Sequence, residues 1–519
     1  MISAIDRFWA KPQAWLSGLP RWRGRLAALL LGCIATLAMP PVDIVPALLV
    51  ALPPLFWLVD GAQRPRAAFW LGGFFGLGHF STGLYWIVFA YLVPPADFAA
   101  LGVPSVIGLA ALLSIFVGLG CALHVYLARR FLARRHAWQR VVLFCVCFVL
   151  FEWLRGHVMT GFPWNQIAHV WFRSDTFSQS AALWGAYGLS LVTMLAFTLP
   201  AAGWRGLAGG ALLLAAMAGG GAWRLSGDTG ANQPGVHLRV VQPNVPQAEK
   251  WDPGNIARQF QDLLRLTAAP ADQKPTIVIW PESALTFDAA SNPNALAAIG
   301  TVVPKGGYIL TGAPRLARGP DGKRQAYNSL HAIDDQGRIV ATYDKFHLVP
   351  FGEYLPLRDI LPLEKTIGRG SFEAGPGPRT IDLPGLPPFS PLICYEIIFP
   401  GAVVDEANRP AWLVNVTNDA WFGYSSGPFQ HLASARLRAI EEGLPLVRSA
   451  NTGISAVIDA YGHIRAQLGL EQTGIIDEEL PSAVSMTPYA ILQDCTVFAL
   501  ALLSIFLAFC PFRTNNRTR

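Results

Sequence analysis

Charged residues are scarce in this sequence. Only 14% of its 519 residues are Asp, Glu, Lys or Arg, whereas 52% are hydrophobic and the mean hydropathy is +0.36. An ordinary soluble domain carries about 25% charged residues, so this composition excludes a purely soluble chain. We expect an integral membrane protein.

Cysteine is almost absent from the polar part of the chain. Six of the seven cysteines lie in or at the edges of apolar stretches, and Cys394 alone falls between residues 224 and 488. That region therefore cannot form an internal disulfide. A lone cysteine is often a small buried hydrophobe, but the polar residues around and upstream of Cys394 favour a nucleophile.

Long apolar stretches are abundant by contrast. A membrane-crossing helix needs about 20 mostly apolar residues. Stretches near or above that length lie at 24–40, 44–60, 67–92, 104–128, 140–155, 182–202, 206–222 and 490–511. The sequence predicts eight transmembrane helices, seven before the polar region and one after it. The predicted domains are an N-terminal membrane domain (1–223), a polar domain (224–488), and a C-terminal helix with a basic tail (489–519).

The net charge of +6 is unevenly distributed. Residues 224–490 hold 22 basic and 27 acidic residues, whereas the rest of the chain holds 18 basic and 7 acidic ones. Basic residues beside apolar stretches mark cytoplasmic loops, so the excess is a topology signal and no footprint of nucleic-acid binding. Seven crossings then place the polar domain outside the cytoplasm. In a bacterial inner membrane this is the periplasmic side.

The polar domain alternates short apolar runs with helical stretches. Strands are expected at 236–242, 276–280, 308–312, 329–333, 339–343, 390–394, 412–417, 446–449 and 454–459. Helices are expected at 255–266, 293–299 and 429–442. This alternation predicts a layered α/β domain, and its roughly 265 residues suffice for a core of its own.

Three residues with complementary chemistry occur at the ends of predicted strands: Glu282, Lys345 and Cys394. A rigid scaffold can present such residues to a cleft. A free thiol has a pKa of about 8.5 and is mostly protonated at neutral pH, so Glu282 could act as its general base. Lys345 could stabilise an oxyanion. We interpret the three residues as a catalytic triad.

The triad segments resemble the carbon–nitrogen hydrolase (nitrilase) superfamily and, within it, the apolipoprotein N-acyltransferase family. The resemblance is carried by the segments 280–282, 344–345, 393–396, 347–356, 415–423 and 241–247, by Trp251, and by the seven-plus-one arrangement of apolar stretches. It implies an α-β-β-α sandwich for the polar domain and a thioester acyl-enzyme on Cys394.

The resemblance also implies the substrates. The acyl donor is a phospholipid such as phosphatidylethanolamine, and the acceptor is the α-amino group of the N-terminal diacylglyceryl-cysteine of an apolipoprotein, in the final step of lipoprotein maturation. No cofactor and no metal are implied, and the sequence has no phosphate-binding loop or zinc motif. We expect a monomer in the bacterial inner membrane, with no nucleic-acid partner.

Several further residues are expected near the triad. Glu353 matches an auxiliary glutamate of the superfamily, and Glu396 beside the nucleophile is a second candidate for orienting it. The backbone N–H of Tyr395 could support the oxyanion. His347 and His431 stand isolated in the sequence and are expected to be structural or to face substrate.

Aromatic residues and a loop complete the predicted site. Trp251, Trp421 and Phe422, like Tyr395, could line an acyl or headgroup cleft, although aromatic side chains also serve as packing. The segment 351–377, which is punctuated by Gly and Pro, is predicted to be a mobile lid.

Two alternatives remain open. A membrane-anchored nitrilase-type amidase would use the same triad with water as acceptor and would release a free acid or ammonia. A transporter with an accessory outer domain would retain its flux without Cys394. Against it, Glu152 and Asp43 are nearly the only acidic residues in or beside the apolar stretches, which is few for an ion relay.

Overall fold

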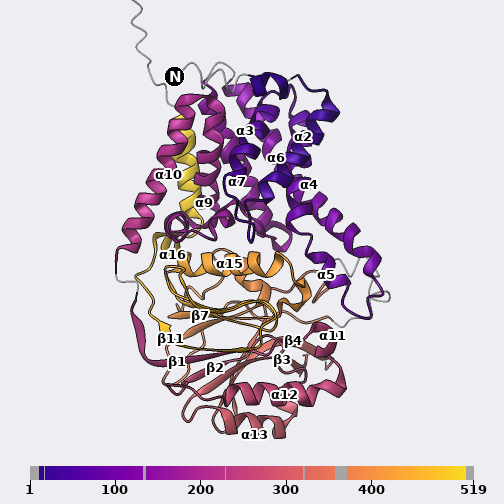
Figure 1. Cartoon of the computed structure of the whole chain (residues 1–519), viewed down its shortest axis with the longest axis vertical. Coiled ribbons are helices and arrows are strands. Elements are labelled where there is room, and N and C mark those ends of the chain that lie inside the picture. The colour runs from indigo at the N-terminus through magenta and orange to yellow at the C-terminus, as the bar shows by residue number, and fades with distance from the viewer. Residues whose placement is uncertain are drawn as a thin grey trace, which may run out of the picture. The chain divides into compact units, whose positions relative to one another are not determined.

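The computed structural model describes residues 11–16, 18–132, 136–227, 230–319, 322–356 and 371–509 (Figure 1). The chain forms two compact units. We call them the helical unit, which comprises Met1–Tyr85, Ala100–Leu225 and Thr487–Arg519, and the sheet unit, which comprises Trp86–Ala99 and Ser226–Met486.

Each of the eight apolar stretches is helical over most of its length. The main helices of the helical unit are α2 (Arg21–Thr36), α3 (Ala47–Asp60), α4 (Pro65–Gly83), α6 (Gly102–Phe131), α7 (Ala137–His157), α9 (Ala181–Thr198), α10 (Trp204–Leu225) and α17 (Cys495–Phe509). Among the described residues, four helical segments are long and apolar enough to cross a membrane: Ala99–Phe131, Ala137–Thr160, Ala181–Ala202 and Trp204–Leu225. The count of eight spans stays a prediction.

The predicted stretch 67–92 is not one helix. Helix α4 ends at Gly83, and the short helix α5 (Ile87–Tyr91) belongs to the sheet unit. Trp86, just before α5, donates a hydrogen bond from Nε1 to Gln430 Oε1 at 3.1 Å, and its ring lies 4.4 Å from that of Phe422. A hydropathy pattern does not reveal these contacts with residues more than 330 positions away. A single helix over the whole stretch 67–92 is therefore not what forms, although the stretch is apolar throughout.

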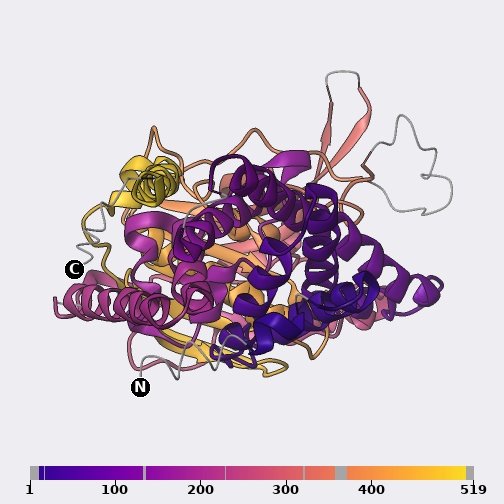
Figure 2. The ribbon, with the colours of Figure 1, turned by 90° about the horizontal axis from the view of Figure 1, so that it is seen from above.

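The sheet unit contains two sheets. The first has the order β11 (Gly474–Pro481), β1 (Asn232–Gln242), β2 (Ile277–Ile279), β3 (Tyr308–Arg318), β4 (Arg324–Asp334), β5 (Ile339–Asp344). The second has the order β10 (Ile464–Leu468), β9 (Ser455–Ile458), β8 (Leu446–Ala450), β7 (Trp412–Thr417), β6 (Phe389–Ile393). Strands β1–β3 and β6–β8 are parallel, and the other neighbours are antiparallel. The far end of the β3–β4 hairpin projects from the rest of the sheet unit (Figure 2).

The sheets pack face to face between two helical layers. Side chains from both sheets form one buried cluster that includes Val240, Ile279, Leu330, Val414 and Val447. Helices α12 (Pro253–Thr267) and α13 (Pro293–Val302) bury Leu263 and Ile299 against the outer face of the first sheet (Figure 1). Helix α15 (Gly427–Glu442), buried along nearly all its length, contacts β8. The order of layers is therefore helix, sheet, sheet, helix, as predicted.

Two strands escaped the sequence pattern. Strand β10 alternates half-buried and exposed residues, and β11 carries three consecutive acidic residues, so neither resembles a buried apolar run. Pairing with a distant segment stabilises β11: Val240 of β1 faces Ile476, and the buried Arg239 lies 2.6 Å from Asp477. Edge strands of this kind are decided by tertiary contacts.

Candidate active site

The three predicted triad residues follow strands that end at one region of the sheet unit. Glu282 comes three residues after β2, Lys345 directly after β5, and Cys394 directly after β6. Lys345 Nζ lies 3.9 Å from Glu282 Oε1, and both charges act on the Cys394 thiol. The hydroxyl of Ser449 on β8 lies 3.1 and 3.2 Å from the carbonyl oxygens of Val241 and Ile279, which joins the two sheets close to these strand ends.

The carboxylate of Glu282 is fixed at both oxygens. Asn328 Nδ2 donates to Oε1 and the backbone N–H of Asn418 donates to Oε2, each at 2.8 Å. Lys250 Nζ donates to the backbone carbonyl of Glu282 at 3.2 Å. Burial lowers the pKa of Lys250 to about 8, while the charge of Glu282 opposes that shift. Glu282 is therefore held as an oriented, largely buried carboxylate.

Lys345 is buried between two carboxylates. Its Nζ lies 2.8 Å from Glu353 Oε2, closer than it lies to Glu282. Burial works against the ammonium form, but Glu353, and then Glu282, raise the pKa of Lys345 well above its ordinary value. Asn328 Nδ2 donates to Glu353 as well as to Glu282, at 2.9 Å. The site thus contains a permanently charged lysine in a fixed place.

Cys394 occupies a strained turn. Its φ is +53°, in the left-handed region that non-glycine residues avoid, which costs about 1–3 kcal/mol. Burial, and next the charge of Glu282, raise the pKa of the thiol, while Lys345 lowers it. The thiol is therefore protonated at rest and needs a base before it can attack.

Glu396 connects the turn after β5 to the turn after β6. Its Oε1 accepts hydrogen bonds from Tyr343 Oη and from the backbone N–H groups of Phe346 and His347, at 2.8–3.2 Å. Its Oε2 accepts from the N–H of Ile393 at 2.7 Å. Burial raises the pKa of Glu396 to about 7, although Lys345 and these N–H donors oppose the shift. Glu396 thus braces the residues next to both Lys345 and Cys394.

The predicted aromatic residues differ in their surroundings. Trp251, directly after the short helix α11 (Gln247–Lys250), is 47% exposed. Tyr395 is buried, with its ring 5.1 Å from that of Phe399. Phe422 packs between Trp86 and His431, and Trp421 is half-buried.

Most of the predicted lid lies outside the described residues. These omit 357–370, so only the two ends of the segment 351–377 have a described structure. At one end Phe351 is 68% exposed, and at the other Gly375 donates its N–H to the carbonyl of Lys345 at 2.8 Å.

The sequence analysis missed several residues that the structure places here. Asn328 lies inside β4, and Asn418 directly follows β7. The rule that singled out Glu282, a polar residue at the end of an apolar strand, could also have found Asn418. His431, which was expected to be structural or to face substrate, lies with its Nε2 3.1 Å from the carbonyl oxygen of Cys394.

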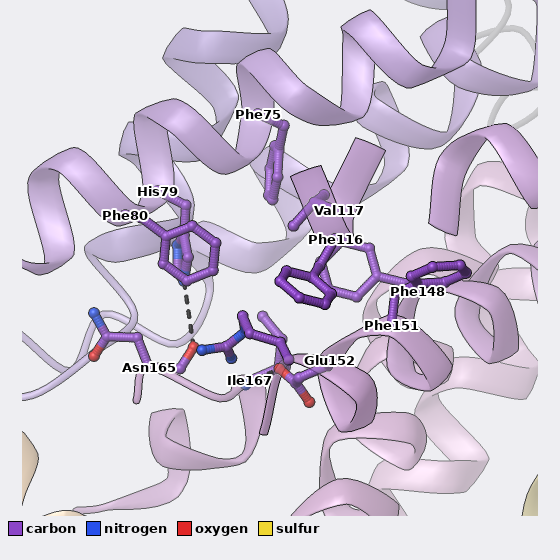
Figure 3. A pocket seen from close by; sticks show the side chains of 11 residues that line it. Phe75, His79, Phe80, Phe116, Val117, Phe148, Phe151, Glu152, Asn165 and Ile167 are labelled. Carbon is purple, nitrogen blue, oxygen red and sulfur yellow. Dashed lines mark hydrogen bonds between the residues drawn. The ribbon is translucent and has the colours of Figure 1, made fainter. Parts of the chain in front are cut away.

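The helical unit contains a separate small cavity (Figure 3). Aromatic rings line it together with Glu152, Asn165 and His79, and His79 Nε2 lies 3.5 Å from the carbonyl oxygen of Asn165. Its size is close to that of a water molecule, so it cannot hold an organic substrate.

The two acidic residues considered for a transporter, Glu152 and Asp43, lie in the helical unit. Glu152 accepts a hydrogen bond from Ile167 N, and Asp43 accepts one from Arg173 at 2.8 Å. Both acids of the transporter alternative therefore have local partners.

A carboxylate, a lysine and a thiol at strand ends of a two-sheet sandwich define the class of the sheet unit. Residues 238–489 match the family model described as carbon-nitrogen hydrolase. A solved amidase of the nitrilase superfamily from Nesterenkonia, a C145A mutant, aligns with 52% of this chain and 99% of its own, at 18% identity and a TM-score of 0.37. The match to the family model assigns residues 238–489 to a carbon–nitrogen hydrolase domain.

The comparisons extend over the whole chain. Residues 31–199 match the model described as apolipoprotein N-acyltransferase N-terminal domain. Proteins named apolipoprotein N-acyltransferase from Rhodopseudomonas palustris and Bradyrhizobium diazoefficiens are 40% and 42% identical, each over 94% of this chain and 95% of their own. The chain belongs to the apolipoprotein N-acyltransferase family. It is an acyltransferase and a bacterial membrane protein.

Proposed function

We propose that the protein transfers an acyl chain from a phospholipid, through a thioester on Cys394, to the α-amino group of the N-terminal diacylglyceryl-cysteine of apolipoproteins. Family membership supports the reaction class. The observation that carries the mechanism is the convergence of a fixed carboxylate and a charged lysine on the strained Cys394 turn. In this mechanism Glu282 transfers protons, Lys345 stabilises the oxyanion and Cys394 is the nucleophile.

The first half-reaction forms the acyl-enzyme. Glu282 removes the proton of the thiol, and Cys394 Sγ attacks the carbonyl carbon of the donor ester. The negative charge that develops on the carbonyl oxygen is stabilised by Lys345 Nζ and by the backbone N–H of Tyr395. Collapse breaks the ester C–O bond, and the leaving lysophospholipid takes the proton from Glu282.

The second half-reaction forms the amide. The acceptor amine attacks the thioester carbonyl, and Glu282 accepts the amine proton as the C–N bond forms. The C–S bond then breaks, and the proton on Glu282 returns to the thiolate. The raised pKa of Cys394 makes the thiolate a strong base, so protonation completes its departure.

The neighbouring residues support this chemistry in different ways. Glu353 holds Lys345 in place at 2.8 Å, and Glu396 braces the turns that carry Lys345 and Cys394. We assign Trp251, Trp421 and Phe422 to substrate binding together with Tyr395. The half-exposed ring of Trp251 is the best placed of them to meet an incoming acyl chain.

We further propose a bacterial inner-membrane location, with eight spans and the catalytic domain on the periplasmic side. The uneven distribution of basic residues supports this orientation. The proposed domain limits are 1–223, 224–488 and 489–519, the donor is phosphatidylethanolamine, and the protein acts as a monomer. A thiol reagent that cannot cross membranes tests this orientation, because it reaches Cys394 only from the side of the membrane on which the catalytic domain lies.

Intact mass measurement tests the reaction. The purified protein is incubated with phosphatidylethanolamine, beside Cys394→Ala, and a diacylated lipopeptide is then added. We expect an acyl-sized mass increase on the wild type only, which the lipopeptide discharges as an amide. An adduct that water discharges equally fast as free acid would instead support the amidase.

A further inference from the structure

A buried histidine contacts the backbone of the proposed nucleophile. His431, on α15, is fully buried, and its Nε2 lies 3.1 Å from the carbonyl oxygen of Cys394. A carbonyl oxygen can only accept a hydrogen bond. Nε2 therefore carries a hydrogen and donates it to Cys394.

The other side of the ring is held by a buried ion pair. His431 Nδ1 lies 2.9 Å from Asp419 Oδ1 and 3.1 Å from Arg448 Nη2. Asp419 and Arg448 are themselves 2.6 Å apart, and Thr417 donates to Asp419 Oδ1 at 2.9 Å. All these side chains are buried. Because both ring nitrogens of His431 have protein partners, the ring cannot serve as the base for the thiol.

The contact with the Cys394 carbonyl determines where the next N–H points. A peptide group is planar, and in the trans form its C=O and N–H point in opposite directions. Holding the carbonyl of Cys394 on His431 therefore directs the N–H of Tyr395 away from His431. The positive φ of Cys394 strains this turn, and a strained turn persists only where surrounding contacts hold it, as His431 does here.

We propose that His431 is a positioning residue for acyl transfer: by holding the carbonyl of Cys394, it aims the N–H of Tyr395 at the developing oxyanion. This inference rests on the proposed function, in which Cys394 is the nucleophile and the N–H of Tyr395 an oxyanion donor, and adds to it the residue that positions this donor. The ion pair of Asp419 with Arg448 sets the orientation of the imidazole. Burial, aided by Arg448, lowers the pKa of His431 and keeps the ring neutral, so Nδ1 accepts a hydrogen bond from Arg448 Nη2, which Asp419 holds in place.

Two substitutions of similar polarity separate this role from simple packing. The amide nitrogen of a glutamine can take the place of Nε2, whereas that of an asparagine reaches only the place of Nδ1. We expect H431N to slow formation of the acyl-enzyme from phosphatidylethanolamine on the order of 10²-fold, the usual effect of losing one oxyanion donor. H431Q should keep most of the rate.

Alkylation of Cys394 by iodoacetamide distinguishes a positioning role of His431 from a purely structural one. Alkylation needs the thiolate but develops no oxyanion, so both variants should alkylate at the wild-type rate. H463N is the matched control, because His463 also pairs with an aspartate, Asp459 at 3.1 Å, in the turn between β9 and β10. It should resemble the wild type in acylation, alkylation and Tm.

Three outcomes would overturn the inference. Wild-type acylation by H431N would show that the hydrogen bond has no role in the reaction. An equal loss of acylation and alkylation in H431N, with a lower Tm, would reduce His431 to a structural residue. A wild-type protein that forms no Cys394-dependent acyl adduct at all would overturn the proposed function as well. The measurement on the wild type alone distinguishes this outcome from the other two.

Discussion

Lys345 Nζ lies 2.8 Å from Glu353 Oε2 and 3.9 Å from Glu282 Oε1, so the lysine of the proposed triad makes its closer ion pair with the auxiliary glutamate. This leaves the carboxylate of Glu282 to its two neutral donors, Asn328 and the N–H of Asn418. Glu282 is thus oriented mainly by neutral donors, and Lys345 mainly by Glu353.

Glu353→Gln should impair catalysis through Lys345. The amide removes the charge that holds Nζ, so the ammonium moves toward Glu282 and leaves the position for the oxyanion. We expect acyl transfer to fall by about 10²-fold, as for other small misplacements of catalytic groups. The rate of amide formation on a diacylated lipopeptide measures it. Glu249→Gln, at a half-exposed residue of the same unit, is the control, and equal rates for both variants would contradict the prediction.

Glu282→Gln should have opposite effects on two reactions of Cys394. Without the base, acyl transfer should fall on the order of 10²- to 10⁴-fold. The charge of Glu282 also raises the pKa of the thiol, so its removal should lower that pKa. Thiolate forms as pH rises through the pKa, and the alkylation profile should therefore shift to lower pH.

Iodoacetamide kinetics between pH 7 and 10, followed by mass spectrometry, test this shift. At any fixed pH in this range Glu282→Gln should alkylate faster than the wild type, and Cys394→Ala corrects for other cysteines. Slower alkylation by Glu282→Gln would mean that Glu282 does not repel the thiolate.

Glu396→Gln should reduce stability and activity together. The substitution replaces one carboxylate oxygen by an NH₂ group. This NH₂ group cannot accept a hydrogen bond, so the N–H donor that it faces loses its partner. An unsatisfied buried donor costs about 1–3 kcal/mol, and the turns after β5 and β6 both lose support. We expect a lower Tm with slower acylation. Glu406→Gln, at an exposed residue farther along the same segment, should change neither, and a Glu396→Gln protein of wild-type Tm would contradict this role.

Trp251→Ala should affect substrate binding without affecting stability. Its side chain is 47% exposed, and substitutions at such positions usually change stability by less than about 0.5 kcal/mol. We expect an unchanged Tm and a raised KM for phospholipid in mixed micelles. Leu316→Ala, which is also an exposed apolar residue but lies on the β3–β4 hairpin, should leave KM unchanged.

Phe422→Ala provides the contrast to Trp251→Ala. Phe422 packs against Trp86 and His431, so its loss should lower Tm by removing contacts of the segment 86–99 with the rest of the sheet unit. An unchanged Tm would contradict this packing role, whereas an unchanged KM for phospholipid would contradict the assignment of Phe422 to substrate binding.

Much of the fold could be predicted because local patterns encode it. Apolar runs long enough to be membrane helices, and short apolar runs between turn residues, require no knowledge of partners. The family, the acyltransferase class and the layered α/β domain followed from such patterns and from the motifs around Glu282, Lys345 and Cys394, and the comparisons and the structure confirmed them. The number of spans, the domain limits and the roles of the site residues remain predictions.

Other features depend on contacts between distant parts of the chain. β11 is a strand because it pairs with β1, and helix α4 stops at Gly83, shortly before the segment Trp86–Ala99 that belongs to the sheet unit.

The sequence by itself determined which residue types stand at the ends of the strands, because the apolar run that marks a strand and the residue that follows it are local properties of the chain. Only the tertiary structure decided that Lys345 pairs more closely with Glu353 than with Glu282, and that His431 holds the carbonyl of Cys394. The physical reason is that a hydrogen bond or ion pair requires its partners within about 4 Å. Only the tertiary fold brings side chains from separate strands, turns and helices that close.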